Sequence, residues 1–259
     1  MVEIKNVDYK YKNGVKAIED LRLDIADGEF IAIIGKNGSG KSTLAKLIAG
    51  LIKPTKGEIV VNEINTRNKK EQINLRKNIG IVFQNPENQI IFNKVYDDLA
   101  FGMKNIGTDH QQIESIIDES LEKVDMLGYK YCESFDLSLG QKQRVVIAGT
   151  LAMAPKILVL DEPTTMVDSQ GKQKIYEILK DLNNRGYTII YITNNMDEII
   201  LAEKVIVLEK GALVEQFLNC DILEKVERLQ ELGMDLPEVI KIYQRLKDKG
   251  KGVLLEDII

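Results

Sequence analysis

Apolar runs too short to be helices recur along the chain and predict a buried β-sheet. The segments 30–34, 79–83 and 188–193 are predominantly apolar over the length of a strand, as in strands that are covered on both faces. The segments 156–162 and 204–211 follow the same pattern. Because helical patterns separate these segments, they predict an α/β fold with a mostly parallel sheet and helices on both faces.

Helical spacing of apolar residues fills the intervals between these strands. The segment 42–51 follows a glycine-rich loop and ends before Pro54, and the segment 170–186 ends at Gly186. Between them, the segment 110–128 has one apolar helical face. That face consists of Ile113, Ile116, Ile117, Leu121 and Val124. We therefore expect a helical insert over about residues 86–150.

The two ends of the chain depart from this pattern. The first thirty residues alternate in polarity around the turn sequences 12-KNG-14 and 26-ADG-28, which predicts an antiparallel β region. From residue 220 the chain has two helical stretches, 221–233 and 237–250. We expect one domain over residues 1–219, followed by a small helical extension over residues 220–259 that serves docking or dimerisation.

Composition narrows the class of protein. The 259 residues are 44% apolar and 29% charged, as in a globular protein, and the net charge of −5 argues against broad binding to nucleic acid. No window approaches the ~20 apolar residues of a membrane helix, so action at a membrane would need a partner. Cys132 and Cys220 lie far apart without a leader, which favours a reducing cytosol. A single histidine, His110, argues against a His-based metal site or a Ser/His triad.

The strongest chemical signal is 35-GKNGSGKS-42, which matches the P-loop pattern between a predicted strand and a predicted helix. In this setting backbone N–H groups and the helix N-terminus bind phosphates, Lys41 reaches the β and γ phosphates of ATP, and Ser42 ligates Mg²⁺. Thr43 adds a hydroxyl. The nucleotide-binding residues predicted here are Gly35, Lys36, Asn37, Gly38, Ser39, Gly40, Lys41, Ser42 and Thr43.

A second signal is the apolar strand 157-ILVLDE-162, which ends in two carboxylates. By itself this pattern is also common in a strand that ends in a solvated acidic turn. Together with a P-loop, it predicts Asp161 in the magnesium shell and Glu162 as the residue that orients or deprotonates the attacking water.

The third signal, 137-LSLGQKQR-144, leads to a family. The order of P-loop, 138-SLGQ-141 and 161-DEP-163 resembles the ATP-binding cassette (ABC) ATPases, with Leu139 in place of the first glycine of the family signature. The resemblance implies that Ser138, Gly140 and Gln141 of one subunit close over ATP on the P-loop of another. Ser138 and Gln141 also match a capping box that starts a helix, and both interpretations can hold.

The resemblance implies further site residues. Gln84, after a predicted strand, would touch Mg²⁺ and the water, Asp168 would lie in the loop that crosses the dimer interface, and Tyr11 would stack on adenine, with Tyr9 as its rival. The longer string 83-FQNPENQ-89 resembles energy-coupling factor (ECF) transporters, the importers of vitamins and of cobalt or nickel ions.

Asn194 departs from the family. In 191-YITNNMDE-198 it occupies the place of a histidine that contacts the γ phosphate, and Asn195 replaces an acidic residue. Asparagine donates a hydrogen bond but has a shorter reach and cannot transfer a proton. Loss of one charge-assisted bond costs ~1.5–3 kcal/mol, or a roughly 10- to 100-fold slower step. A site that binds ATP well and hydrolyses it slowly is predicted, unless a bridging water makes the asparagine adequate.

These inferences lead to one expected function. The chain would be the ATPase subunit of an ECF-type importer, peripheral on the cytoplasmic face of a prokaryotic membrane. Its partners would be a second, homologous but non-identical ATPase, a transmembrane ECF subunit and a substrate-binding membrane subunit, with no nucleic acid. Two alternatives stay open, namely a slow or non-catalytic ATP-binding scaffold and a soluble ABC ATPase that takes no part in transport. The sequence does not identify the transported solute.

Overall fold

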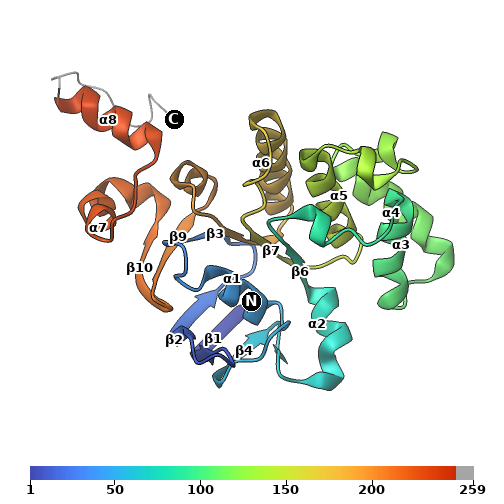
Figure 1. The fold of residues 1–259 in the computed structure, drawn as a ribbon, viewed down its shortest axis with the longest axis horizontal. Helices are drawn as coiled ribbons and strands as arrows, with labels where there is room; N and C mark the ends of the chain where they lie inside the picture. Colours follow the sequence, from blue (N-terminus) through green and yellow to red (C-terminus); the bar gives the residue numbers. More distant parts are fainter. Residues whose placement is uncertain (249–259) are drawn as a thin grey trace.

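A computed structural model describes residues 1–248 of the chain (Figure 1). Its strands are β1 Val2–Lys10, β2 Lys16–Ile25, β3 Phe30–Ile34, β4 Lys56–Val61, β5 Ile64–Asn65, β6 Ile79–Val82, β7 Ile157–Asp161, β8 Thr188–Ile192, β9 Lys204–Glu209 and β10 Ala212–Leu218. Its α-helices are α1 Lys41–Ile48, α2 Gln72–Asn78, α3 Val95–Asn105, α4 His110–Lys123, α5 Leu139–Leu151, α6 Ser169–Asn184, α7 Val226–Glu231 and α8 Glu238–Asp248.

A six-stranded sheet forms the centre of the molecule, in the order β10-β9-β3-β8-β7-β6. The strands from β9 to β6 pair in parallel, and β10 adds an antiparallel edge. All five predicted sheet strands are present, whereas β10 had not been anticipated. The carboxyl ends of β6, β7, β8 and β3 therefore lie at one edge of the sheet, where a ligand site is expected in an open α/β fold.

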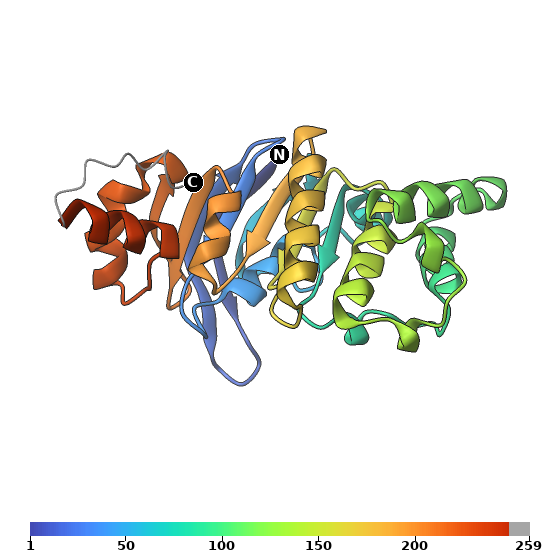
Figure 2. The ribbon, with the colours of Figure 1, turned by 90° about the horizontal axis from the view of Figure 1, so that it is seen from above.

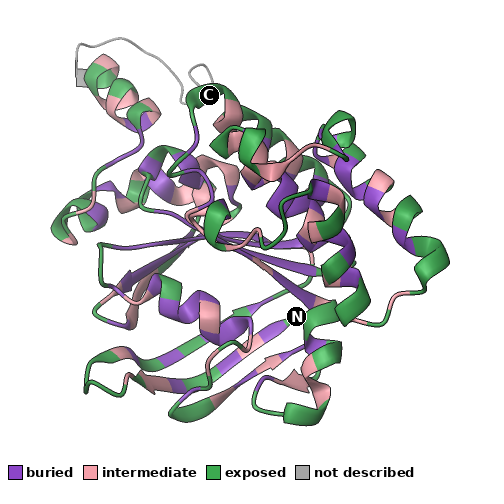
Figure 3. Cartoon of the chain, turned by 45° about the vertical axis from the view of Figure 1, so that its right-hand side comes forward, coloured by how far each residue is buried: buried purple, intermediate pink, exposed green. Residues whose placement is uncertain are grey.

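This sheet separates two hydrophobic cores, which explains its continuous apolar runs. Alternate residues of β3 contribute to the two cores: Ala32 and Ile34 pack with α5 and α6, whereas Ile31 and Ile33 pack with α1 and the N-terminal strands. Figure 1 shows α6 above the sheet and α1 below it, and Figure 3 shows the strands buried between them. Helices on both faces were predicted, and the structure confirms them.

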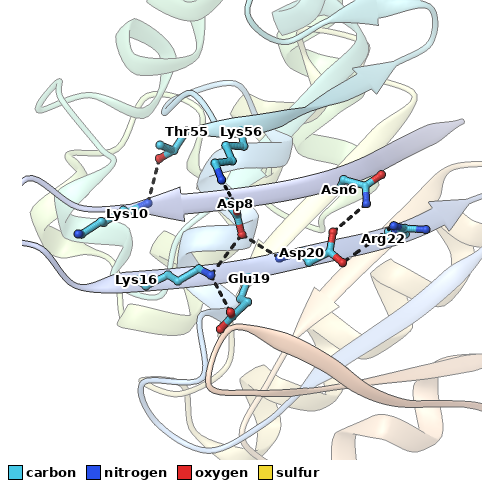
Figure 4. Close-up of polar contacts among 9 residues, drawn as sticks. All are labelled: Asn6, Asp8, Lys10, Lys16, Glu19, Asp20, Arg22, Thr55 and Lys56. Carbon is cyan, nitrogen blue, oxygen red and sulfur yellow. Dashed lines mark hydrogen bonds and ion pairs between the residues drawn. The ribbon is translucent and has the colours of Figure 1, made fainter.

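A four-stranded antiparallel sheet, in the order β2-β1-β4-β5, covers α1 on the side away from the central sheet. The antiparallel β region was predicted from the first thirty residues, but β4 and β5 come from the segment after the P-loop and complete it. Polar pairs cross its exposed face (Figure 4). Asp8, for example, accepts the backbone N–H of Asp20 at 2.9 Å and lies 3.6 Å from the amine of Lys16.

The helical insert and the C-terminal helices lie at opposite ends of the molecule (Figures 1 and 2). In the insert, the helix predicted over 110–128 stops at Lys123, because Asp125 takes a left-handed backbone with φ 56°. In the C-terminal part, the helix predicted over 221–233 is a 3₁₀ segment, Asn219–Lys225, followed by the short α7. The last part of the extension, 249–259, lies outside the described residues.

Candidate nucleotide site

The P-loop connects β3 to α1, as the sequence predicts. Two of its glycines have no room for a side chain. A Cβ at Gly35, where φ is +152°, would lie 2.2 Å from the Leu208 carbonyl oxygen, and a Cβ at Gly40, where φ is +104°, would lie 2.4 Å from that of Ala17. Gly40 also starts α1, so the loop directs the free N–H groups of a helix N-terminus into the site.

Lys41, Ser42 and Asp161 meet where the P-loop faces the end of β7. The Lys41 ammonium donates to the Gly35 carbonyl oxygen at 2.6 Å, and burial lowers the pKa of Lys41 although Glu162 and Asp161 act against this shift. The Ser42 hydroxyl donates to Asp161 Oδ1 at 3.0 Å. Burial raises the pKa of Asp161, and this hydrogen bond opposes the rise.

These residues suit a magnesium nucleotide. A hollow at the P-loop is lined by polar side chains, among them Tyr11, Asn37, Lys41, Ser42 and Glu162. The buried Ser39 hydroxyl has no hydrogen-bond partner in the protein, which is expected of a group that binds a ligand. Ser42 and Asp161 offer the oxygen ligands that Mg²⁺ prefers. Within residues 1–248 no group of three His, Cys, Asp or Glu side chains could hold a metal ion.

Tyr11 and Thr43 lie at the same hollow. The Tyr11 hydroxyl and Thr43 Oγ1 are 2.9 Å apart and share a hydrogen bond, which ties the loop between β1 and β2 to the first turn of α1. The ring of the rival residue, Tyr9, packs edge-on against Tyr11 with the ring centroids 4.9 Å apart. Tyr11 lines the hollow, and its stacking on adenine stays a prediction.

Glu162 and Asn194 come together from two strand ends. Glu162 follows β7 and has a left-handed backbone with φ 51°, which is uncommon for residues other than glycine and asparagine. Its backbone N–H donates to the Ile192 carbonyl oxygen at 2.9 Å. The Asn194 amide donates to the Glu162 carboxylate and to Asn37 Oδ1. The structure thus brings the predicted water-orienting residue, the asparagine and the P-loop into one cluster.

Gln84 lies at the same edge of the sheet, because β6 ends at Val82 and runs parallel to β7. In the described part of the chain, no hydrogen bond joins its side chain to Ser42 or Asp161. Gln89, in the same loop, has a structural role: its Oε1 accepts the Phe83 N–H, and its Nε2 donates to the Ile81 carbonyl oxygen. The predicted contact of Gln84 with magnesium therefore stays a prediction.

The predicted signature residues form a second surface. Ser138 and Gln141 make the expected capping box at the start of α5. Gly140 packs against the loop that ends at Asp168, where a Cβ would lie 3.1 Å from Val167. Asp168 itself caps α6 through the Gly171 N–H at 2.9 Å. A shallow hollow is lined by Ser138, Gly140, Gln141, Arg144, Asp168, Gln170, Gly171 and Lys174.

The signature surface and the P-loop hollow share no lining residue. The residues predicted for the phosphates and the residues predicted for the signature therefore line two different hollows of one chain. Such an arrangement is satisfied when the phosphate-binding half of one subunit meets the signature half of another.

Sequence reasoning missed two groups of residues near the site. Glu198 is buried beneath Asn194 and accepts hydrogen bonds from the hydroxyls of Thr164, Tyr176, Tyr191 and Thr193. The turn of Gly233, Met234 and Asp235 in the C-terminal extension lines a hollow together with Lys36 and Asn194. Two acidic residues directly before the apolar residues of 196-MDEIIL-201 were the only signal for the first group. The second had none, because these residues lie almost 200 positions from the P-loop along the chain.

Comparison with known proteins gives consistent results. A family model described as "ABC transporter" matches residues 18–165. The curated energy-coupling factor transporter ATP-binding protein EcfA1 of Fusobacterium nucleatum is 40% identical over 261 residues, which cover 100% of this chain and 97% of that protein.

Solved structures agree with these sequence relatives. CbiO1 from Clostridium perfringens, described as part of the ABC transporter complex cbiONQ, aligns with a TM-score of 0.80 and 33% identity over 94% of this chain and 98% of its own. A dimeric ATP-binding cassette in a post-hydrolysis state bound to ADP and Pi aligns with a TM-score of 0.77 and 32% identity over 84% of this chain and 98% of its own. These likenesses confirm the predicted resemblance and the predicted fold class.

Proposed function

We propose that this chain, which belongs to the ABC transporter family and within it to the ECF transporter ATP-binding proteins, is the ATPase subunit that energises a membrane importer. As an ABC ATPase it binds and hydrolyses ATP. No helix in residues 1–248 has the length and apolar character needed to span a membrane. As the ATPase subunit of an importer, the chain lies in this proposal on the cytoplasmic face, attached to a transmembrane partner.

Each residue of the P-loop cluster has a distinct role in this proposal. The P-loop N–H groups and Lys41 bind the phosphates, and Ser42 and Asp161 hold Mg²⁺, with Gln84 as a further ligand. When bound, Mg²⁺ would neutralise part of the negative charge on the phosphates. Glu162 orients the attacking water and accepts its proton, since its carboxylate stands at the end of β7 in reach of Asn194. Tyr11 stacks on the base.

Closure of the site requires a second subunit. The observation that carries this step is that the P-loop hollow and the signature hollow share no residue. In a head-to-tail pair, Ser138, Gly140 and Gln141 of one subunit cover ATP on the other, and Asp168 lies at the seam. Because Asn194 attenuates the site built on this chain's P-loop, we propose a homologous, non-identical ATPase as the partner.

An apolar surface supports a transmembrane partner. Ile91 and Phe135 each expose 69% of their area, and Phe92 and Phe101 are also exposed. These residues gather in one region, because the ring centroids of Phe92 and Phe101 lie 5.1 Å apart and the Ser134 hydroxyl donates to the Phe92 carbonyl oxygen. We call Ile91, Phe92, Phe101 and Phe135 the insert patch. Such a patch of exposed apolar side chains is typical of a protein–protein interaction site.

The insert patch is also tied to the site. It begins seven residues after Gln84. Asp98 of α3 accepts the backbone N–H groups of Ile91 and Phe92 at 2.7 and 3.1 Å, which fixes this loop to the insert. A partner bound at the patch can therefore act on the Gln84 loop. This connection is the physical basis on which we assign energy coupling to the chain.

Recovery of the tagged chain from membranes tests the proposal. The chain should copurify with a second ATPase and with membrane subunits, identified by mass spectrometry, and the complex should hydrolyse MgATP. Phe135→Asp should reduce recovery of the membrane subunits at least about tenfold. Ile73→Asp is the matched control, because Ile73 on α2 exposes 56% of its area outside the patch. Recovery of the chain without any membrane subunit would contradict the importer role. The solute, a vitamin or a transition-metal ion in this proposal, then follows from the identity of the substrate-binding subunit.

A further inference from the structure

A buried acidic side chain lies directly beneath the reacting end of the site. Glu198 belongs to the 3₁₀ segment Met196–Leu201 and is 3% exposed. No salt bridge to it occurs among residues 1–248. A buried carboxyl group without a cation is costly unless several donors satisfy it, and it contributes less to stability than an apolar side chain of similar volume. Its presence at this position therefore calls for a role other than stability.

Glu198 joins the two loops that carry the reacting pair. Its Oε1 accepts a hydrogen bond from Thr164 Oγ1 at 2.7 Å, and its Oε2 accepts one from Thr193 Oγ1. Thr164 lies two residues after Glu162, and Thr193 directly precedes Asn194. Each member of the Glu162–Asn194 pair is therefore within two residues of a hydroxyl that is bound to the same carboxyl group.

Two tyrosines complete this junction from the core side. Tyr176 of α6 donates to Oε1 at 2.8 Å and Tyr191 of β8 donates to Oε2 at 3.0 Å, while the oxygens of the Tyr191 and Thr164 hydroxyls lie 3.2 Å apart. Burial and the neighbouring Glu198 raise the pKa of both phenols, so both stay protonated as donors. The junction is thus anchored to the sheet and to α6, and both loops are attached to it.

We propose that Glu198 is a positioning residue for ATP hydrolysis, which sets the separation of Glu162 and Asn194 through the hydroxyls of Thr164 and Thr193. It is buried, so it acts on the site through these two loops. A change in either hydroxyl displaces one loop relative to the other, and a displacement of ~1 Å at a reacting group can cost about 100-fold in rate. Binding of ATP rests on the P-loop and is unaffected. This inference rests on the ATPase activity in the proposed function and not on the identity of the membrane partner.

Three substitutions that each remove one hydroxyl from the same carboxyl group form a matched set. Thr164→Val and Thr193→Val keep the shape of the side chain and act on the loops that carry the reacting pair. Tyr176→Phe removes an equivalent hydrogen bond from α6, which carries no reacting group. Thr164→Val and Tyr176→Phe should lower the melting temperature by a similar amount, so a difference in kinetics between these two reports positioning rather than stability. Thr193→Val should lower it further, because the Thr193 hydroxyl also accepts the Asn195 N–H at 2.9 Å.

In the complex, Thr164→Val and Thr193→Val should lower kcat at least about tenfold while KM for MgATP stays within about twofold. Thr164→Ser and Thr193→Ser keep the hydroxyl and should restore most of kcat. Tyr176→Phe should leave kcat within about twofold of the wild type. Unchanged kcat in both valine variants, or an equal loss in Tyr176→Phe, would overturn the proposal, as would a loss confined to KM.

Hydrogen exchange of the full chain gives a readout that needs no turnover and no membrane partner. Thr164→Val should speed exchange in residues 193–199, and Thr193→Val should speed it in residues 162–168, because the two loops share Glu198. An increase confined to the mutated loop would contradict the coupling. Failure of the importer role appears instead as absence of the membrane complex, so the two failures are distinguishable.

Discussion

The side-chain amide of Asn194 donates hydrogen bonds to the Glu162 carboxylate and to Asn37 of the P-loop. A primary amide has two N–H donors, so both are directed at protein acceptors. Asn194 must release one of these bonds before it can reach a γ phosphate. The structure thus adds a second physical argument, beside the shorter reach of asparagine, for the predicted slow hydrolysis.

Asn194→His should raise single-turnover hydrolysis by roughly 10- to 100-fold, because one charge-assisted hydrogen bond to the γ phosphate is gained. Affinity for ATP should change much less, since the P-loop supplies most of the ground-state binding. The assay uses the assembled complex with the partner's site disabled through its P-loop lysine. Equal rates for the variant and the wild type would show that asparagine is a working substitute, and would remove the argument for an unlike partner.

Lys41→Ala should weaken MgATP binding by about 10- to 100-fold, as expected for the loss of a charged hydrogen bond to phosphate. Lys36→Ala is the control within the same loop. The Lys36 side chain extends to the C-terminal turn, where a Cβ on Gly233 would lie 2.5 Å from its amine. Nucleotide titration should separate the two variants, and equal affinities for Lys41→Ala and the wild type would refute the assignment of the phosphate site.

Glu162→Gln should stabilise the ATP-bound dimer. The substitution keeps an oxygen that can accept from Asn194 but removes the base that activates water, so hydrolysis slows while phosphate contacts persist. Light scattering with MgATP and the partner should detect more dimer than for the wild type. The double variant with Lys41→Ala should lose this gain. A variant that stays monomeric at every nucleotide concentration would count against the head-to-tail mechanism.

Asp161→Asn should raise the melting temperature and also raise the concentration of Mg²⁺ that turnover needs. Burial raises the pKa of Asp161 in the folded protein above its ordinary value of 3.8. Between pH 3.8 and this raised pKa, the folded protein therefore binds more protons than the unfolded chain. The free energy of unfolding therefore falls as pH rises through this window, and the penalty persists at pH 7. Removal of the charge should raise the melting temperature at pH 7, by an amount that shrinks as pH approaches 3.8.

The same Asp161→Asn variant should need at least about tenfold more Mg²⁺ for half-maximal turnover, because an anionic ligand has been replaced by a neutral one. Unfolding curves across pH and a magnesium titration of ATPase activity check the two halves of this prediction. A melting temperature at pH 7 that equals or lies below the wild-type value would show that the Asp161 charge is compensated in the fold.

Asp197→Ala should loosen the C-terminal extension. Asp197 Oδ1 accepts the Glu238 N–H at 2.6 Å at the start of α8, and loss of such a helix-capping contact costs about 1 kcal/mol. Residues 233–248 should then become more sensitive to protease, whereas the P-loop should not. Asp197→Asn, which can still accept this bond, is the control. Equal sensitivity of Asp197→Ala and the wild type would show that packing alone holds α8.

Sequence by itself determined the parts of this protein whose information is local. Strands buried on both faces need apolar side chains at every position, so β3, β7 and β8 were recognisable as continuous runs. A phosphate loop needs small residues at fixed spacing, so the segment from Gly35 to Ser42 was recognisable, and the structure explains Gly35 and Gly40 sterically. The capping box of Ser138 and Gln141 is likewise a local pattern, and it is present.

Only the tertiary structure decided which distant residues share a site. Asn194 and Asn37 are 157 positions apart, and they meet because β8 pairs with β3 in the parallel sheet, which places both following loops at one edge. Glu198 had only a weak signal in the sequence, because a buried carboxyl group is identified by the hydroxyls that surround it. These come from β8 and the residue after it, from α6 and from the loop after β7. Periodicity reports which face of an element is buried, whereas hydrogen bonds between elements depend on how those faces pack.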